Sequence, residues 1–295
     1  MSTTESKVIE DPFQLRPVWD AVLEVYREFV KVCNRHNLRF YMTDGNAIGA
    51  LRHHGFIPWD DDLDVSMPRP DYERFLELAP RELPSYLKIV NARNTPEFLG
   101  LFSKIQDSRR VYVESIEKKL GFELSNGIFI DVFAIDGYPS RRVAAWCYTL
   151  VCWIQHQVMR YRSMHFKAQS RKGKIMWLLG MCLSPFVWGM KTGNDFILRA
   201  ECRNRSHPFE TSELTGRSGT TLWKRLIFKK EVWGEPVFVD FDLGLKVPLP
   251  HDYDHYLRYD YGDYMTLPPE SSRHPSHTYA DRCPWWLGPT TNCKP

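Results

Sequence analysis

The sequence has no apolar run long enough to span a membrane as a helix, and it has no strong net charge. Its two most apolar stretches, residues 143–159 and 175–190, are shorter than the roughly 20 residues that a spanning helix needs, and polar residues or Pro185 interrupt them. Thirty-nine basic and thirty-six acidic residues give a net charge of +3. Bulk charge therefore gives no argument for a nucleic-acid partner, and a transmembrane protein is not expected.

Targeting and redox signals are also scarce. The first residues, MSTTESKVIEDP, lack the basic start, apolar middle and small cleavage-site residues of a signal peptide, so a cytoplasmic location is the default expectation. The seven cysteines form no CxxC pair, and most lie among apolar neighbours, which favours reduced thiols. The spacing of His274, His277 and Cys283 lacks a fourth ligand, so a polar loop is favoured there over a zinc site.

Helical and strand periodicities alternate along the first 140 residues. Apolar residues at three- and four-residue steps predict a helix over 17–35, and shorter helices are expected at 47–53, ended by Gly55, and at 71–79. Strands are predicted at 38–43, 63–67, 86–91, 98–105, 110–115 and 127–135, and again at 237–241 and 245–250 before a Tyr-rich helix at 251–262. The pattern predicts a mixed α/β architecture around a sheet.

The middle of the chain differs in composition. Between the two apolar stretches, residues 160–174 hold six Lys or Arg residues and no acid. Apolar helices beside a basic stretch suit a helical insertion that lies on an anionic membrane surface. Two core helices joined by a solvated basic loop would give the same pattern, so both interpretations stay open.

Aspartates mark the candidate site. On a strand, Asp62 and Asp64 would project from one face while Leu63 and Val65 enter the core. Two such carboxylates repel each other unless a divalent cation neutralises them, and oxygen ligands favour Mg²⁺ or Mn²⁺. Asp131 is a single charge in an apolar strand. A paired buried acid is one interpretation, but a third metal ligand from a neighbouring strand is favoured.

The stretch GNAIGALRHHGFIPWDDDLD, residues 45–64, closely resembles the signature of the LicD family, the phosphocholine-type transferases related to fukutin. FSKIQD at 102–107, GIFIDVFAIDGYP at 127–139 and YGDYMTLPP at 261–269 resemble later blocks of that family in the expected order. The resemblance implies a nucleotidyltransferase fold of the α/β (α+β) class, with a mixed β-sheet core, flanking helices and a helical insertion. The implied organisation is a catalytic core over 1–140, a helical insertion over 141–205 that could face a membrane, and a C-terminal part over 206–295 that completes the catalytic domain.

The resemblance also implies residue roles. Asp62, Asp64 and Asp131 would be the catalytic, metal-binding triad for Mg²⁺ or Mn²⁺. The expected nucleotide- and substrate-binding residues are Gly45, Asn46, Arg52, Lys104, Arg273 and His274. Asn46 departs from the family pattern, which usually has Gly, Ser or Thr there, although its side chain can still form hydrogen bonds.

Other conspicuous residues are given structural roles. His53 and His54 are expected to cap or pack a short helix, and Trp59 is expected to brace the loop beside the acids. The tyrosines between residues 253 and 264 are expected to pack a helix, although an aromatic cage for a quaternary ammonium would need such residues.

The expected function is metal-dependent transfer of a phospho-substituent, most simply phosphocholine from CDP-choline, to a hydroxyl of a cell-surface glycan or its lipid-linked precursor. The expected partners are the CDP-activated donor, the glycan acceptor and an anionic membrane at the inner face of the plasma membrane, with no nucleic acid. The alternatives are the same chemistry with CDP-ribitol, CDP-glycerol or a nucleoside triphosphate, a glycosidase that uses the carboxylates as an acid and base pair, and a non-catalytic membrane-surface adaptor.

Overall fold

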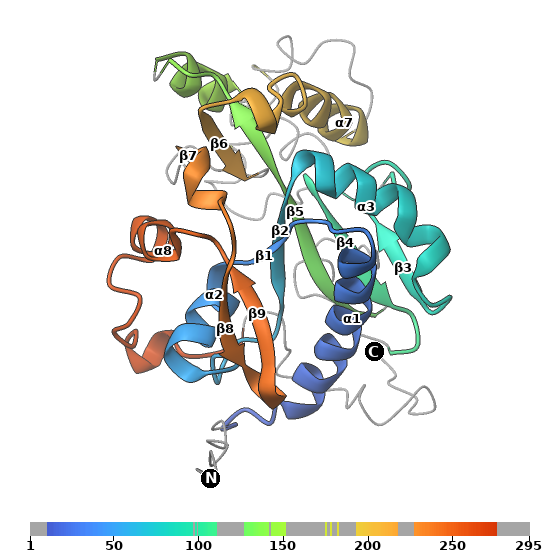
Figure 1. The fold of residues 1–295 in the computed structure, drawn as a ribbon, viewed down its shortest axis with the longest axis vertical. Coiled ribbons are helices and arrows are strands. Elements are labelled where there is room, and N and C mark those ends of the chain that lie inside the picture. Colours follow the sequence, from blue (N-terminus) through green and yellow to red (C-terminus); the bar gives the residue numbers. More distant parts are fainter. Residues whose placement is uncertain are drawn as a thin grey trace.

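The computed structural model describes residues 11–96, 98, 100–110, 127–141, 143–151, 175, 178, 182, 193–217 and 227–275. A mixed seven-stranded sheet lies at the centre of this part of the chain (Figure 1). Its strands are β1 (Tyr41–Met42), β2 (Asp64–Pro68), β3 (Leu87–Val90), β4 (Phe102–Asp107), β5 (Ile128–Tyr138), β6 (Leu214–Arg217) and β7 (Ile227–Lys229). This architecture confirms the predicted fold class.

Strand β5 is the central strand of the sheet and pairs with three other strands. The order is β1-β2-β5-β4-β3, and β6 pairs with the C-terminal part of β5 and with β7. The β2–β5 pair is parallel, and the other pairs are antiparallel. Because β2, β4 and β6 all pair with β5, side chains from four strands meet on its two faces.

One face of the sheet is mainly apolar and lies under two helices, α1 (Arg16–Arg35) and α3 (Arg69–Glu82) (Figure 1). The residues on this face that are fully buried are Val65, Met67, Ile105, Ile130, Val132 and Ala134. Helix α1 begins with Pro17 in its first turn and buries Trp19 and Phe29, as its three- and four-residue apolar spacing requires. The predicted helices over 17–35 and 71–79 are confirmed.

Several shorter elements pack around the sheet, among them a hairpin that contacts β1 and η1. They are α2 (Asp44–Ile48), the π-helical turn η1 (Gly49–His53), the hairpin β8 (Val237–Phe241) and β9 (Leu245–Leu249), and α8 (Tyr253–Tyr261). Short 3-10 turns are η3 (Phe209–Thr211), η4 (Lys230–Trp233), η5 (Asp242–Gly244) and η6 (Glu270–Ser272). Phe56 joins the hairpin to α1, because its ring stacks on Trp19 at 5.3 Å and meets Phe241 at 5.1 Å between centroids. Tyr256 of α8 donates a hydrogen bond to Asp44 of α2, and the two helices can be located in Figure 1.

The end of the short helix near residue 53 corrects one expectation. The left-handed residue is His54, with φ 58°, and not Gly55. Glycine is instead required at position 49, because a Cβ atom there would lie 2.3 Å from the carbonyl oxygen of Gly55. The chain thus crosses itself closely just before the aspartates.

The predicted helical insertion is described only in part. Residues 143–151 are helical, as are 175, 178 and 182, and helix α7 (Gly193–Asn204) follows. Most of the predicted strand at 110–115 and most of 152–192 lie outside the described residues. Within the part that the structure describes, no helix has the length and apolar character needed to cross a membrane. The domain boundaries at 140 and 205 stay a prediction.

Candidate active site

The polar face of the sheet places three charged residues in one row across strands β2, β5 and β4. Asp64 pairs in register with Asp131 on the parallel neighbour, and Asp131 pairs with Lys104 on the antiparallel neighbour. The Lys104 ammonium lies 3.1 Å from Oδ1 of Asp131 and 3.2 Å from the centroid of the Phe129 ring. The predicted neighbourhood of Asp64 and Asp131 is therefore present, and Lys104 partly offsets their charge.

The segment 60–64, which leads into β2 and includes its first residue, is held by hydrogen bonds from several elements. The Asn46 side-chain amide donates to the Asp62 carbonyl oxygen at 2.9 Å, and its Oδ1 accepts from the Asp64 backbone N–H at 2.6 Å. Indole Nε1 of Trp19 donates to the Asp60 carbonyl oxygen at 2.7 Å. The acidic side chains are thus carried by a fixed backbone and do not form a solvated turn.

Asn46 is fixed by hydrogen bonds to the aspartate segment. It is 1% exposed, and both of its polar side-chain atoms bond the backbone of residues 62 and 64. It positions the aspartates, and its expected contact with phosphate stays a prediction.

Gly45 is required by the aspartates as well. A Cβ atom at position 45 would lie 2.5 Å from Oδ2 of Asp60, so any side chain would displace that carboxylate. This Oδ2 atom is buried and has no hydrogen-bond partner among the described residues. A buried carboxylate oxygen without a donor is costly, which marks the position as one that a cation would stabilise.

Mutual repulsion dominates the electrostatics of the cluster. Burial, and then the charge of Asp62, raises the pKa of the Asp60 carboxyl well above its usual value. Burial also raises the pKa of Asp64, with further contributions from the charges of Asp62 and Asp131, while Lys104 opposes them. Burial and neighbouring negative charge therefore disfavour the ionised forms of Asp60 and Asp64.

These donors fit a hard divalent cation in chemistry and charge. Carboxylate oxygens are the ligands that Mg²⁺ and Mn²⁺ prefer, and an ion of charge +2 would relieve the repulsion. No three His, Cys, Asp or Glu side chains within the described ranges already form a group that could hold a metal ion. The carboxylates of Asp62, Asp64 and Asp131 would have to draw together around the ion.

A buried carboxylate that the sequence analysis did not single out ties the site to the C-terminal part of the chain. Asp44, at φ 55°, accepts hydrogen bonds from Tyr256 at 2.9 Å and Tyr261 at 3.3 Å, and its second oxygen pairs with Arg217 of β6. The Arg217 guanidinium also lies 4.1 Å from the centre of the Phe133 ring, two residues beyond Asp131. The position of Asp44 directly before Gly45 was the one signal in the sequence, whereas nothing there marks Arg217.

Two predicted binding residues meet in a second group. Arg52 donates from Nη1 to the carbonyl oxygens of Tyr264 and Thr266, and Arg273 lies 5.7 Å from the centre of the Trp59 ring. His274 is exposed and makes no hydrogen bond or ion pair with another described residue. The predicted substrate-binding residues therefore form three groups. Gly45, Asn46 and Lys104 lie at the aspartates, Arg52 lies with Arg273, and His274 forms no hydrogen bond or ion pair with either group.

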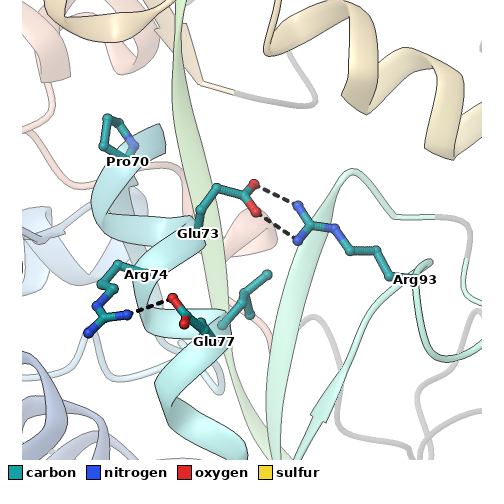
Figure 2. A pocket seen from close by; sticks show the side chains of 6 residues that line it. Pro70, Glu73, Arg74, Glu77 and Arg93 are labelled. Atoms are coloured by element: carbon teal, nitrogen blue, oxygen red, sulfur yellow. Dashed lines mark hydrogen bonds and ion pairs between the residues drawn. The ribbon is translucent and has the colours of Figure 1, made fainter.

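A hollow on helix α3 is separate from this chemistry (Figure 2). Its charged side chains pair with each other, Glu73 with Arg93 and Arg74 with Glu77. None of the predicted site residues lines it. Paired surface charges of this kind contribute little to binding, so the hollow is not the candidate site.

Comparisons with known proteins find similar sequences over most of the chain. The family model described as LicD/FKTN/FKRP, nucleotidyltransferase domain, matches residues 37–172, which include Asp62, Asp64 and Asp131. The lipopolysaccharide cholinephosphotransferase LicD of Haemophilus influenzae is 26% identical over 257 residues, covering 86% of this chain and 92% of that protein. Uncharacterised proteins of Rickettsia typhi and Rickettsia prowazekii are 28% and 26% identical over 61 residues, about a fifth of this chain.

Proposed function

Since the chain belongs to the LicD family and is a phosphotransferase, we propose that it moves phosphocholine from CDP-choline to a hydroxyl of a cell-surface glycan or of its lipid-linked precursor, with release of CMP and of the hydroxyl proton. The similar protein from Haemophilus influenzae is named a lipopolysaccharide cholinephosphotransferase, which supports this choice of head group and acceptor class. We include Mg²⁺ or Mn²⁺ in the proposal.

The observation that carries the proposal is the register of Asp64 and Asp131 on neighbouring strands, with Asp60 and Asp62 beside them. Burial and repulsion raise the pKa of Asp60 and Asp64, so their ionised forms cost stability. Such a cluster is useful where a cation must be held against a phosphate. This register is what supports the choice of the aspartates as the proposed site.

The side chains have distinct tasks in this scheme. Asp62, Asp64 and Asp131 would hold the metal, which when bound would neutralise phosphate charge and lower the pKa of a hydroxyl. Phosphoryl-type transfer depends mainly on positioning and charge, so no covalent nucleophile is required. Lys104, next to Asp131, is within reach of a phosphate held there, and Asn46 orients the backbone that carries Asp62 and Asp64.

Calorimetric titration of CDP-choline tests the proposal. The wild type should bind in the presence of Mg²⁺ or Mn²⁺, and the Asp62→Ala/Asp64→Ala double variant should lose the metal-dependent part. Asp240→Ala serves as the matched control, because Asp240 is an exposed acid on β8 that pairs with the exposed Lys246. Metal-independent binding of equal strength in the wild type and the double variant would contradict the proposal.

The donor head group has its own test. Transfer assays with CDP-choline, CDP-ribitol, CDP-glycerol and a nucleoside triphosphate, each with the same metal, compare the members of one chemistry. The proposal expects the highest kcat/KM with CDP-choline. A higher value with another donor would replace phosphocholine and leave the metal site in place.

We extend the proposal to the inner face of the plasma membrane. The helix over 143–151 exposes Val143, Trp146 and Val151, which are 76%, 43% and 46% exposed, and the helical residues Ile175 and Leu178 are 56% and 59% exposed. Apolar side chains at helical spacing beside the basic stretch 160–174 suit an anionic lipid surface. Vesicles containing anionic lipid should carry the protein upward in a flotation gradient, whereas Val143→Ser/Trp146→Ser should stay with the soluble fraction.

A further inference from the structure

The two arginines of the second group, which we call the arginine pair (Arg52 and Arg273), are held by one stretch of main chain. Arg52 Nη1 donates to the carbonyl oxygen of Tyr264 at 2.5 Å and to that of Thr266 at 3.2 Å. Arg273 Nε donates to the carbonyl oxygen of Pro268 at 2.8 Å. These bonds fix both guanidinium groups near residues 264–268 although the two arginines are more than two hundred positions apart in the sequence.

Two aromatic side chains border the arginine pair. Nε2 of His53 accepts a hydrogen bond from Arg52 Nε at 3.0 Å, and its ring lies 6.2 Å from that of Trp59. The centre of the Trp59 ring in turn lies 5.7 Å from the guanidinium carbon of Arg273. Burial, and then the charge of Arg52, lowers the pKa of His53 to about 4, so this imidazole is neutral at pH 7 and adds no positive charge.

The arginine pair lacks a carboxylate in the part of the chain that the structure describes. Neither residue forms an ion pair there with Asp or Glu, whereas Arg69 pairs with Asp136 and Arg217 pairs with Asp44. Burial and the charge of Arg273 lower the pKa of Arg52, and no carboxylate opposes them. Two neighbouring guanidinium groups without a counter-charge are unfavourable, and an oxyanion between them would offset the repulsion.

We propose that the arginine pair is a phosphate-binding site, with Trp59 as one wall and His53 fixing the orientation of Arg52. Arg52 Nη2 and both Nη atoms of Arg273 carry no hydrogen bond to another described residue, and a planar guanidinium presents such N–H groups as a fork that matches phosphate oxygens. Both arginines and Trp59 are half-buried, so the pair is accessible from solvent and partly shielded.

The inference rests on the proposed function only for the identity of the ligand. A donor diphosphate and a phosphate carried by the acceptor present the same chemistry to the arginine pair. Trp59 directly precedes Asp60, so a phosphate held there lies at the border of the aspartate segment. Binding of phosphate as such requires neither the aspartates nor a metal.

Calorimetric titration of inorganic phosphate, at low salt and in EDTA, tests the site. Arg52→Gln and Arg273→Gln should each weaken binding roughly ten-fold, because each removes charge-assisted hydrogen bonds. Arg81→Gln is the control, since Arg81 is exposed on α3 and makes no ion pair within the described residues. Arg273 lies after the last described helical turn, so its variant separates lost binding from misfolding if Arg52→Gln does not fold.

Further binding experiments identify whether the phosphate belongs to the donor or to the acceptor. They also distinguish the phosphate-binding site from the proposed transferase function. Weaker binding of CDP-choline with Mg²⁺ in both arginine variants would assign the donor, and weaker binding of a sugar phosphate alone would assign the acceptor. Asp64→Asn should leave phosphate binding unchanged. Arginine-dependent phosphate binding without any transfer activity would overturn the proposed function and keep this site. No binding by the wild type, or an equal loss in Arg81→Gln, would overturn the site.

Discussion

Strands β2, β5 and β4 present apolar side chains on one face and charged side chains on the other, because successive residues of a strand point to opposite faces. Under α1 and α3, Val65, Ile130 and Val132 are fully buried and apolar. On the other face, Asp64 and Asp131 lie beside Lys104. The period of two along each strand puts a packed core and a charged site within one backbone thickness of each other.

The contrast teaches where stability and chemistry are carried. Buried apolar side chains stabilise the sheet in proportion to the area they remove from water. The carboxylates repel one another and raise the pKa values of Asp60 and Asp64, which costs stability. The apolar face therefore supports a charged face that would not be stable by itself.

The largest expected effect comes from Asp64→Asn, which should lower activity without lowering stability. We expect kcat/KM for the proposed phosphocholine transfer to fall roughly 10³-fold, because Asp64 is a proposed metal ligand and such a ligand contributes several kcal/mol to the transition state. The free energy of unfolding should stay equal or rise, since one repelling charge is gone. Steady-state kinetics with Mg²⁺ measure the change in kcat/KM, and urea unfolding in EDTA measures the change in the free energy of unfolding. A stability loss as large as the activity loss would contradict the division between the faces.

Ile130→Ala is the counterpart on the apolar face, one residue before Asp131. Its side chain is fully buried, so the cavity should lower the free energy of unfolding by roughly 2–5 kcal/mol. Activity of the folded fraction at low temperature should stay within a few-fold of wild type. Urea unfolding followed by circular dichroism gives the first quantity, and kinetics at low temperature give the second. A large activity loss in fully folded protein would show that the faces are coupled.

Lys104→Met probes the cation that pairs with Asp131. In EDTA the variant should lose about 1–3 kcal/mol of stability, because Asp131 is left without this counter-charge in a buried position. Mg²⁺ should recover more of the loss than Na⁺ at equal ionic strength, which thermal unfolding with each salt measures. Equal effects of the two salts would argue against a divalent site.

Asp44→Asn tests whether every charged residue on the polar side serves activity. Asp44 lies on that side, but its contacts give it a structural role. Asparagine tolerates the left-handed conformation and can still accept hydrogen bonds from Tyr256 and Tyr261, but it loses the charge that pairs with Arg217. We expect a loss of about 1 kcal/mol in unfolding free energy and a smaller loss of activity than for Asp64→Asn. Asp240→Asn, which removes the charge of an exposed pair with Lys246, is the control. An unchanged stability would remove Asp44 from the set of residues that hold α8.

Local signals in the sequence predict much of the fold and of the site. Apolar spacing marks α1 and α3, and alternation marks β2, β5, β8 and β9, because these periods are set by the geometry of the helix and the strand themselves. The half-buried Asp62 and Asp64 between the buried Leu63 and Val65 follow the same rule. The end of the short helix is not predicted correctly, since the close approach of Gly49 to Gly55 depends on how the chain folds back.

By itself, the sequence determined which side chains could act and which face each would take, because both depend on residues next to one another in the chain. Only the tertiary structure decided that Asp131 stands in register with Asp64, that Lys104 faces it, and that Asn46 holds the aspartate segment. Arg217 joins Asp44 from 173 positions away, and Arg52 joins Arg273 through the carbonyls of residues 264–268. The physical reason is that strand order and loop closure depend on packing the whole core, and no local pattern encodes the partner of a distant charge.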